Sequence, residues 1–182
     1  GFNVSKYRPQ VYKSFSGKSQ NLKIKDAVMS SCAAPSYFPL HKDSVSGQYG
    51  LDGGCYANDP TDCCYAEAIK LYGSNAKIKI LSVGTGYLHS TNDPSKLKKY
   101  GGINWLLCGN LIDLMFHAPA LAVDYKMKAF TEALGHEYLQ LNCDSCDIGL
   151  DDVSEESIEK LKTIGNDVYD KNRTNILAFF CG

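Results

Sequence analysis

The stretch Gln48-Tyr49-Gly50-Leu51-Asp52-Gly53-Gly54 decides how the rest of this chain is interpreted. Residues 48–52 predict a short strand, and two glycines follow the carboxylate at its end. Because neither glycine carries a Cβ, the backbone can turn sharply and leave room beside the Asp52 side chain. Such a carboxylate can accept a proton in catalysis, or it can be a turn residue that bonds nearby backbone amides. Taken alone, the motif favours the turn.

Size and charge limit the kind of protein. The 182 residues, 44% of them hydrophobic, suffice for one globular domain with a buried core. A net charge of −1 offers no basic stripe for phosphates, so we expect no nucleic-acid partner. No apolar run reaches the roughly 18 to 20 residues of a membrane span. We therefore expect a soluble cytoplasmic or vacuolar protein, for which peripheral membrane contact stays open.

The cysteines favour neither a disulfide framework nor a metal site. Eight are present, but the expected helices and strands supply a core without covalent cross-links, so we expect reduced thiols. Cys143 and Cys146 have the spacing of two metal ligands, yet zinc takes about four ligands and no second pair lies at a matching interval. We predict no metal and no cofactor.

The first third of the chain predicts short elements. The alternation of apolar and polar residues over 11–15 predicts a strand. Asp26 is placed to cap or open a short helix that runs through Ala33, and Pro35 stops it. The strand 48–52 follows.

From Asp59 onward the pattern becomes helical. Asp59 suits an N-cap and Pro60 the first helical position. An apolar stripe then predicts a helix that ends at Gly73, with Tyr65, Ala68, Ile69 and Tyr72 on its buried face. Residues 77–83 predict a strand buried inside a sheet.

The remaining elements alternate in the same way. The apolar stretch 103–116 predicts a helix that packs in a core or faces lipid, with core packing the commoner outcome. Pro119 is expected to break it. We then expect a helix over 120–134, a strand over 137–141, and a last helix from Ser154 to about Tyr169. Alternating strands and helices predict a layered α/β protein.

Three motifs together resemble the second half of the patatin-like phospholipase domain. They are Ala27-Val28-Met29-Ser30-Ser31-Cys32-Ala33-Ala34-Pro35, Asp52-Gly53-Gly54 and Ala57-Asn58-Asp59-Pro60. The strand and turn 81–86 and the tail 138–164 are also similar to that family. The resemblance implies an α/β sheet with helices on both faces, and residues 1–182 as the C-terminal part of a single patatin-like domain.

The family resemblance implies a chemistry and a site. It implies a lipid acyl hydrolase with a Ser-Asp dyad, in which Asp52 is the aspartate and Gly53, Gly54 and Asn58 shape its loop. The implied substrate is a phospholipid or galactolipid ester, with no metal or other cofactor. Asp59 replaces the second Asn of the family's Asn-Asn-Pro, a change that keeps a good helix cap.

The serine of the dyad is not found. No G-x-S-x-G elbow and no glycine-rich oxyanion segment occur in these residues. Both precede the Asp-Gly motif in the family, so we expect an N-terminally truncated domain whose missing upstream segment bears the nucleophile. The alternative is a catalytically inactive lipid-binding, regulatory or storage module of the same fold.

Other nucleophiles and bases are weaker candidates. Ser30 and Ser31 lie in a predicted helix without an elbow, which favours packing and hydrogen bonding. None of the histidines falls in a recognisable motif, so we expect partly buried or surface roles rather than a Ser-His-Asp triad. The histidines are His41, His89, His117 and His136.

Overall fold

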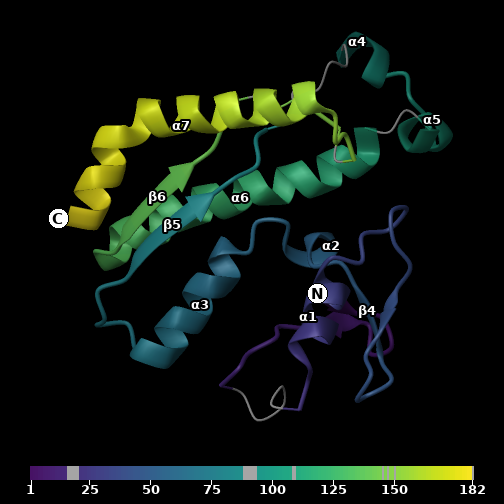
Figure 1. The fold of residues 1–182 in the computed structure, drawn as a ribbon, viewed down its shortest axis with the longest axis horizontal. Helices are drawn as coiled ribbons and strands as arrows, with labels where there is room; N and C mark the ends of the chain where they lie inside the picture. The colour runs from purple at the N-terminus through teal and green to yellow at the C-terminus, as the bar shows by residue number, and fades with distance from the viewer. Residues whose placement is uncertain are drawn as a thin grey trace. The chain divides into compact units, whose positions relative to one another are not determined.

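The fold was obtained as a computed structural model, which describes residues 1–15, 21–87, 94–107, 110–144, 146, 148–149 and 151–181. Figure 1 shows the order of its elements. The chain divides into two compact units, Gly1–Asp59 and Pro60–Gly182. The assignment of the whole chain to a single domain stays a prediction.

The first unit contains a small antiparallel sheet. Its strands lie in the order β2 (Arg8–Pro9), β1 (Phe2–Asn3), β4 (Tyr49–Leu51) and β3 (His41–Lys42). Leu51 pairs with Phe2, and Gly50 pairs with both Asn3 and His41. The predicted strand over 48–52 is confirmed as β4, which therefore has a neighbour on each side.

The strand predicted over residues 11–15 was wrong. β2 ends at Pro9, and residues 11–15 form irregular backbone and a turn. β2 pairs with β1, which is only two residues long. The Gln10 amide donates to the Gly1 carbonyl (2.9 Å), next to the β1–β2 pair.

Helix α1 (Ile24–Ser31) confirms the predicted short helix but begins before Asp26. Lys23 is the N-cap, and Asp26 lies inside the first turn with only 2% of its surface exposed. Its carboxylate bonds to residues outside the helix, so the capping role was wrong. Helix α2 (Gly54–Ala57) is a single turn directly after Asp52 and Gly53.

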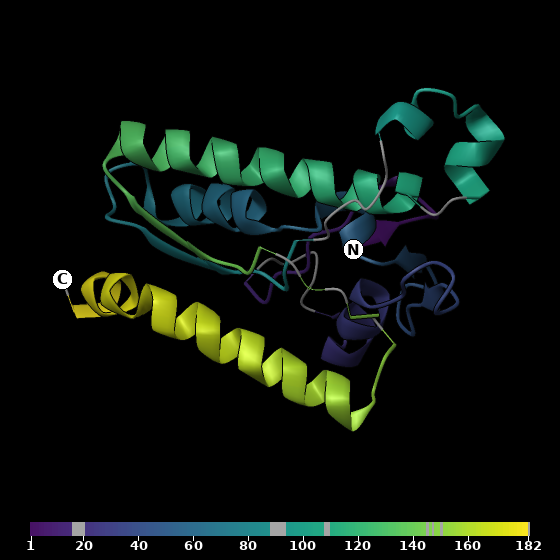
Figure 2. The ribbon, with the colours of Figure 1, turned by 90° about the horizontal axis from the view of Figure 1, so that it is seen from above.

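The second unit is built around two parallel strands, β5 (Lys79–Val83) and β6 (Glu137–Leu141), paired in register from Lys79↔Glu137 to Val83↔Leu141. Figure 2 shows α7 (Glu155–Cys181) on one side of this pair, and α3 (Thr61–Tyr72) with α6 (Asn110–Leu134) on the other. The predicted mixture of helices and strands is confirmed, and in this unit helices lie on both sides of the strand pair.

The core of the second unit joins α3, α6 and the strands. Tyr65 of α3 packs against Val123 and Met127 of α6, and Ile80 and Tyr138 of the strands cover this cluster. On the same two helices, Lys126 Nζ lies 2.6 Å from Asp62 Oδ2. Tyr65 and Ile69 thus lie on the inner face of α3, as the periodicity predicts.

Two details of the predictions around α3 and β5 were wrong. Pro60 rather than Asp59 is the residue before the helix, and Tyr72 is exposed because it lies beyond the last turn that faces α6. Helix α3 does end at Gly73, whose φ of 82° favours glycine. β5 is not buried on both faces, since Leu81 and Val83 are exposed in the described structure.

Helix α6 runs through Pro119, which was expected to break it. The predicted helix 103–116 appears as α5 (Gly102–Leu107) and the start of α6, and residues 108–109 lie outside the described part. A proline removes one backbone donor, and the packing of Val123 and Met127 beyond it offsets that loss. Core packing of the stretch was wrong for Ile103, Leu114 and Met115, which are exposed.

The last helix is longer than predicted. α7 begins after Ser154, whose hydroxyl accepts a hydrogen bond from the Ser157 amide (3.3 Å), so the predicted cap is confirmed. The helix continues past Tyr169 to Cys181. A short helix α4 (Pro94–Leu97) precedes α5. Within the described residues, no helix combines the length and apolar composition that crossing a membrane requires.

Candidate active site

The Asp52 loop is fixed by the backbone of the segment that follows α1. The Asp52 amide donates to the Ala33 carbonyl (3.1 Å), and the Gly53 amide donates to the Ser31 carbonyl (3.1 Å). The end of β4 is thereby tied to the Ser-Cys-Ala-Ala-Pro segment. Two backbone bonds on consecutive residues define the position and direction of the Asp52 side chain.

The Asp52 carboxylate is half-buried and takes part in a tight turn. The Gly54 amide donates to Oδ1 at 2.5 Å, two residues along the chain. This is the turn geometry that Asp favours, and it precedes the single turn of α2. Among the described residues, Oδ2 accepts no hydrogen bond. The carboxylate therefore has one oxygen fixed by the backbone and one available to a hydroxyl donor.

The glycines act through the space they leave rather than through an unusual backbone. Gly53 has φ −64° and ψ −31°, which any residue can adopt, so the turn after Asp52 is present but does not require a glycine backbone at this position. A Cβ on Gly53 would lie 3.2 Å from Ser31 Oγ. A residue with a side chain would therefore fit poorly at position 53, where α1 and the loop approach each other closely.

A second close approach was missed by the sequence analysis. A Cβ on Gly50 of β4 would lie 2.5 Å from Ser30 Oγ and 2.6 Å from Ser30 Cβ. Gly50 and Ser30 are both buried. Ser30 thus packs against the strand that ends in Asp52, in agreement with a packing role rather than a nucleophilic one. A glycine inside a predicted strand was the signal in the sequence.

Cys55 lies within electrostatic reach of Asp52. Partial burial of the thiol and, secondarily, the negative charge of Asp52 raise the pKa of Cys55. The sequence analysis did not place this cysteine in the site. Asn58, predicted to shape the loop, is the exposed residue that ends α2. Its positioning role stays a prediction.

In the same unit, His41 and Ser44 form a polar cluster around the buried Asp26. His41 Nε2 lies 2.8 Å from Asp26 Oδ1, and the Ser44 hydroxyl donates to Asp26 Oδ2 at 2.6 Å. In a Ser-His-Asp triad the histidine bridges the serine and the aspartate. Here the aspartate lies between the other two, so the cluster joins α1 to β3 and its turn and is no catalytic triad.

The same cluster lowers the pKa of the Asp26 carboxyl. The hydrogen bonds from Ser44 and then from His41 lower the pKa of Asp26 to about 2. Both contacts stabilise the carboxylate over the neutral acid. Asp26 thus stays charged in the interior of the first unit through most of the acid range.

The other histidines have structural partners or lie outside the described part. His136 Nδ1 lies 2.7 Å from the buried Tyr65 hydroxyl, and the His117 ring meets Tyr87 edge to face with ring centres 5.3 Å apart. For His41 and His136, the expected satisfied and partly buried role is confirmed. His89 lies outside the described residues.

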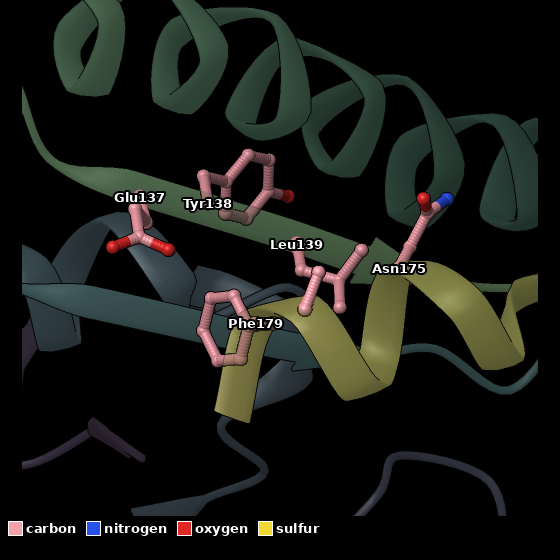
Figure 3. A pocket seen from close by; sticks show the side chains of 6 residues that line it. Glu137, Tyr138, Leu139, Asn175 and Phe179 are labelled. Carbon is pink, nitrogen blue, oxygen red and sulfur yellow. The ribbon is translucent and has the colours of Figure 1, made fainter. Parts of the chain in front are cut away.

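The second unit has a shallow hollow of about 370 Å³ beside β6 and α7. Figure 3 shows Glu137 and Leu139 of β6 on the side of α7, near Asn175 and Phe179, whereas Tyr138 lies on the opposite face of the strand. Lys79 borders this region, with Nζ 3.2 Å from Glu137 Oε1 and 2.9 Å from the Phe179 carbonyl oxygen. The lining contains no predicted site residue and no nucleophile paired with a base.

Similarity to known proteins adds to this geometry. No family model matches the chain. It is 28% identical to patatin-like protein 2 of Oryza sativa subsp. indica, over 96% of this chain and 52% of that protein. It is 27% identical to patatin-like protein 3 of Arabidopsis thaliana, over 96% of this chain and 48% of that protein.

A bacterial protein is similar as well. The chain is 29% identical to the cGAMP-activated phospholipase of Pseudomonas aeruginosa, over 80% of this chain and 44% of that protein. The chain spans about half the length of the curated relatives it matches. The chain is thus similar to patatin-like proteins along nearly all of its length and matches about half of each of them.

Proposed function

We propose that this chain supplies the catalytic carboxylate, Asp52, of a lipid acyl hydrolase whose serine lies outside these 182 residues. The observation that carries the proposal is the Asp52 loop, held by the Ser31 and Ala33 carbonyls at the end of β4. The absence of a G-x-S-x-G elbow from the sequence, and a match to about half of each relative, support a nucleophile supplied by another segment.

The proposed chemistry uses the two carboxylate oxygens differently. Oδ1 holds the Gly54 amide and fixes the side chain, while Oδ2 takes the proton of the serine hydroxyl as its oxygen attacks the ester carbonyl. The proton then passes to the departing alcohol of the lipid. In the second half, Oδ2 takes a proton from the water that attacks the acyl-serine, and this proton then passes to the serine oxygen as the fatty acid is released.

The substrate class rests on the relatives. One of them is named as a phospholipase, and the plant relatives are named as patatin-like proteins. We assign a carboxylic ester of a glycerolipid, either a phospholipid or a galactolipid, as the substrate. The protein would contact the lipid surface only peripherally. Hydrolysis of an ester by a carboxylate and a serine needs no metal or organic cofactor in this scheme.

Turnover by the protein made from its complete coding sequence tests the proposal. Hydrolysis of phosphatidylcholine vesicles, of galactolipid vesicles and of a p-nitrophenyl ester should fall about 10²- to 10⁴-fold in Asp52→Asn. Asp59→Asn, a change of charge seven residues away, is the matched control and should retain turnover. Equal turnover of Asp52→Asn and the parent on all three substrates would discard the proposal.

One observation favours a second candidate function. The Gly54 amide bond to Asp52 Oδ1 is also what a purely structural turn residue makes. An inactive lipid-binding or storage module would therefore keep the same loop. Such a module would sediment with lipid vesicles and release no fatty acid, and Asp52→Asn would leave its vesicle binding unchanged.

A further inference from the structure

Two loops meet at the carboxyl ends of the parallel strands. Since β5 and β6 run in the same direction, the residues after Val83 and after Leu141 emerge at the same edge. In parallel sheets this edge is where functional groups gather. Here the first loop brings Gly84-Thr85-Gly86-Tyr87, and the second brings Asn142 and the two cysteines of a Cys-x-x-Cys sequence, Cys143 and Cys146.

Hydrogen bonds fix the two loops against each other. The Gly84 amide donates to the Leu141 carbonyl (2.8 Å), the Tyr87 amide donates to the Cys143 carbonyl (3.1 Å), and the Cys146 amide donates to the Tyr87 carbonyl (3.3 Å). Asn142 Oδ1 accepts from the Gly86 amide at 2.7 Å. The backbone on both sides of the cysteine pair is therefore anchored to one short stretch of chain.

Gly86 shows that the two cysteine side chains converge. A Cβ on Gly86 would lie 2.8 Å from Cys143 Sγ and 2.7 Å from Cys146 Cβ. Two atoms within 2.8 Å of one point cannot be more than about twice that distance apart, so the two cysteine side chains are neighbours, and both must rotate to bring the sulfurs to the roughly 2 Å of a disulfide. Gly86 has φ 103°, so the glycine both permits the turn and leaves room for the sulfurs.

The donor set favours thiol chemistry over a metal ion. Zinc takes about four ligands, and the described residues contain no group of three or more histidine, cysteine or acidic side chains placed to hold a metal. Both cysteines are thiols in the structure and half-buried. Two thiols whose side chains converge in this way are suited to oxidation and reduction.

We propose that Cys143 and Cys146 form a redox-active dithiol that passes reversibly to an intramolecular disulfide. The oxidant is a small-molecule disulfide such as oxidised glutathione.

In the first step, one cysteine thiolate attacks a glutathione sulfur, forming a mixed disulfide and releasing one glutathione thiolate. The second cysteine thiolate attacks the first cysteine's sulfur, closing the protein disulfide and releasing the second glutathione. The protein dithiol is oxidised by two electrons, one glutathione disulfide becomes two thiols, and the two cysteine protons pass to the two glutathiones.

Mapping of alkylated peptides tests this step. Trypsin releases residues 129–160 as one peptide that contains these two cysteines and no other. After equilibration of the folded protein with oxidised glutathione and then N-ethylmaleimide, that peptide should carry no alkyl group and be two hydrogens lighter. After reduction with dithiothreitol it should carry two alkyl groups.

Cysteine variants and a denatured control distinguish a dithiol that the fold holds together from two cysteines that pair only because they are close in sequence. Cys143→Ser and Cys146→Ser should each leave a glutathione adduct on the remaining thiol, whereas Cys32→Ser should not alter the result. The folded protein should reach half-oxidation at a lower ratio of oxidised to reduced glutathione than protein unfolded in guanidinium. Full alkylation of peptide 129–160 after oxidant, or an equal or higher ratio for the folded protein, overturns the proposal.

Discussion

The Asp52 side chain shows how one carboxylate can serve a turn and still accept a proton. Its Oδ1 holds the Gly54 amide, and the backbone amides of residues 52 and 53 are bound by the segment after α1. These contacts restrict the rotamers of the side chain, which lowers the entropy lost when a hydroxyl group docks on Oδ2. Proton transfer from a serine at this position would then be favoured by geometry.

Cys55 offers a readout of the Asp52 charge that needs no substrate. Its thiol pKa is raised by partial burial and by Asp52. Asp52→Asn removes the second cause, so the pKa of Cys55 should fall and its alkylation by iodoacetamide at pH 8 should become faster. Burial remains, so part of the shift should persist. Peptide mapping over a series of pH values measures the change.

Asp59→Asn is the matched control for that measurement. It removes a nearby negative charge that does not contribute to the raised pKa of Cys55. The alkylation rate of Cys55 should be the same in Asp59→Asn and in the parent. An unchanged rate in Asp52→Asn would mean that the Asp52 charge lies farther from the thiol than the structure places it.

The Asp26 cluster should make the first unit sensitive to acid. A carboxyl whose folded pKa is lowered to about 2 from 3.8 stabilises the fold above pH 3.8, and that contribution is lost as the pH falls toward about 2. In Ser44→Ala, which removes the largest cause, the pH dependence of the urea midpoint between pH 5 and pH 2 should be weaker. A curve parallel to that of the parent would contradict this account.

At the scale of elements, β4 and α1 are coupled through a contact with no room for a methyl group. Gly50→Ala would place a Cβ 2.6 Å from Ser30 Cβ, so α1 must shift. We expect a loss of about 1–3 kcal/mol in the free energy of unfolding, measured by urea denaturation. The same substitution should cost less in a Ser30→Gly background than in the parent, and an equal cost in both would exclude this contact as the cause.

Among the described side chains of helix α6, burial differs sharply along the helix. Met127 is 0% exposed, whereas Met115 on the same helix is 67% exposed. Met127→Ala should lower the free energy of unfolding by about 2–5 kcal/mol because it leaves a cavity. Met115→Ala is the control and should change it by less than about 0.5 kcal/mol. Thermal denaturation followed by circular dichroism compares them, and similar losses would place the core elsewhere.

The errors in predicting elements have local causes. The alternation over 11–15 predicted a strand, but a strand also needs a partner, and these residues pair with no strand of the described part. Pro119 predicted a break in the helix. The packing contacts of Val123 and Met127, which lie after the proline, cannot be recognised from the residues near it in the sequence. Where an apolar stripe and an end signal agreed, as in α3 with Gly73, the prediction held.

At the scale of the whole molecule, the sequence predicted the α/β class and the family resemblance, and the similarity to patatin-like proteins bears out the resemblance. It could not predict the partners of buried polar groups. Asp26 was assigned to a helix cap because its contacts, His41 and Ser44, are 15 and 18 residues away in the chain. The convergence of Cys143 and Cys146 on Gly86 likewise depends on the parallel pairing of β5 with β6.

The central claim is that Asp52 takes the proton of a serine hydroxyl, and labelling with a fluorophosphonate tests it most directly. The reagent modifies a serine only when a base activates that hydroxyl. In the protein made from the complete coding sequence, we predict one labelled serine outside these 182 residues, and at least about 10²-fold slower labelling in Asp52→Asn. Labelling of Asp52→Asn at the rate of the parent and of Asp59→Asn would contradict the account.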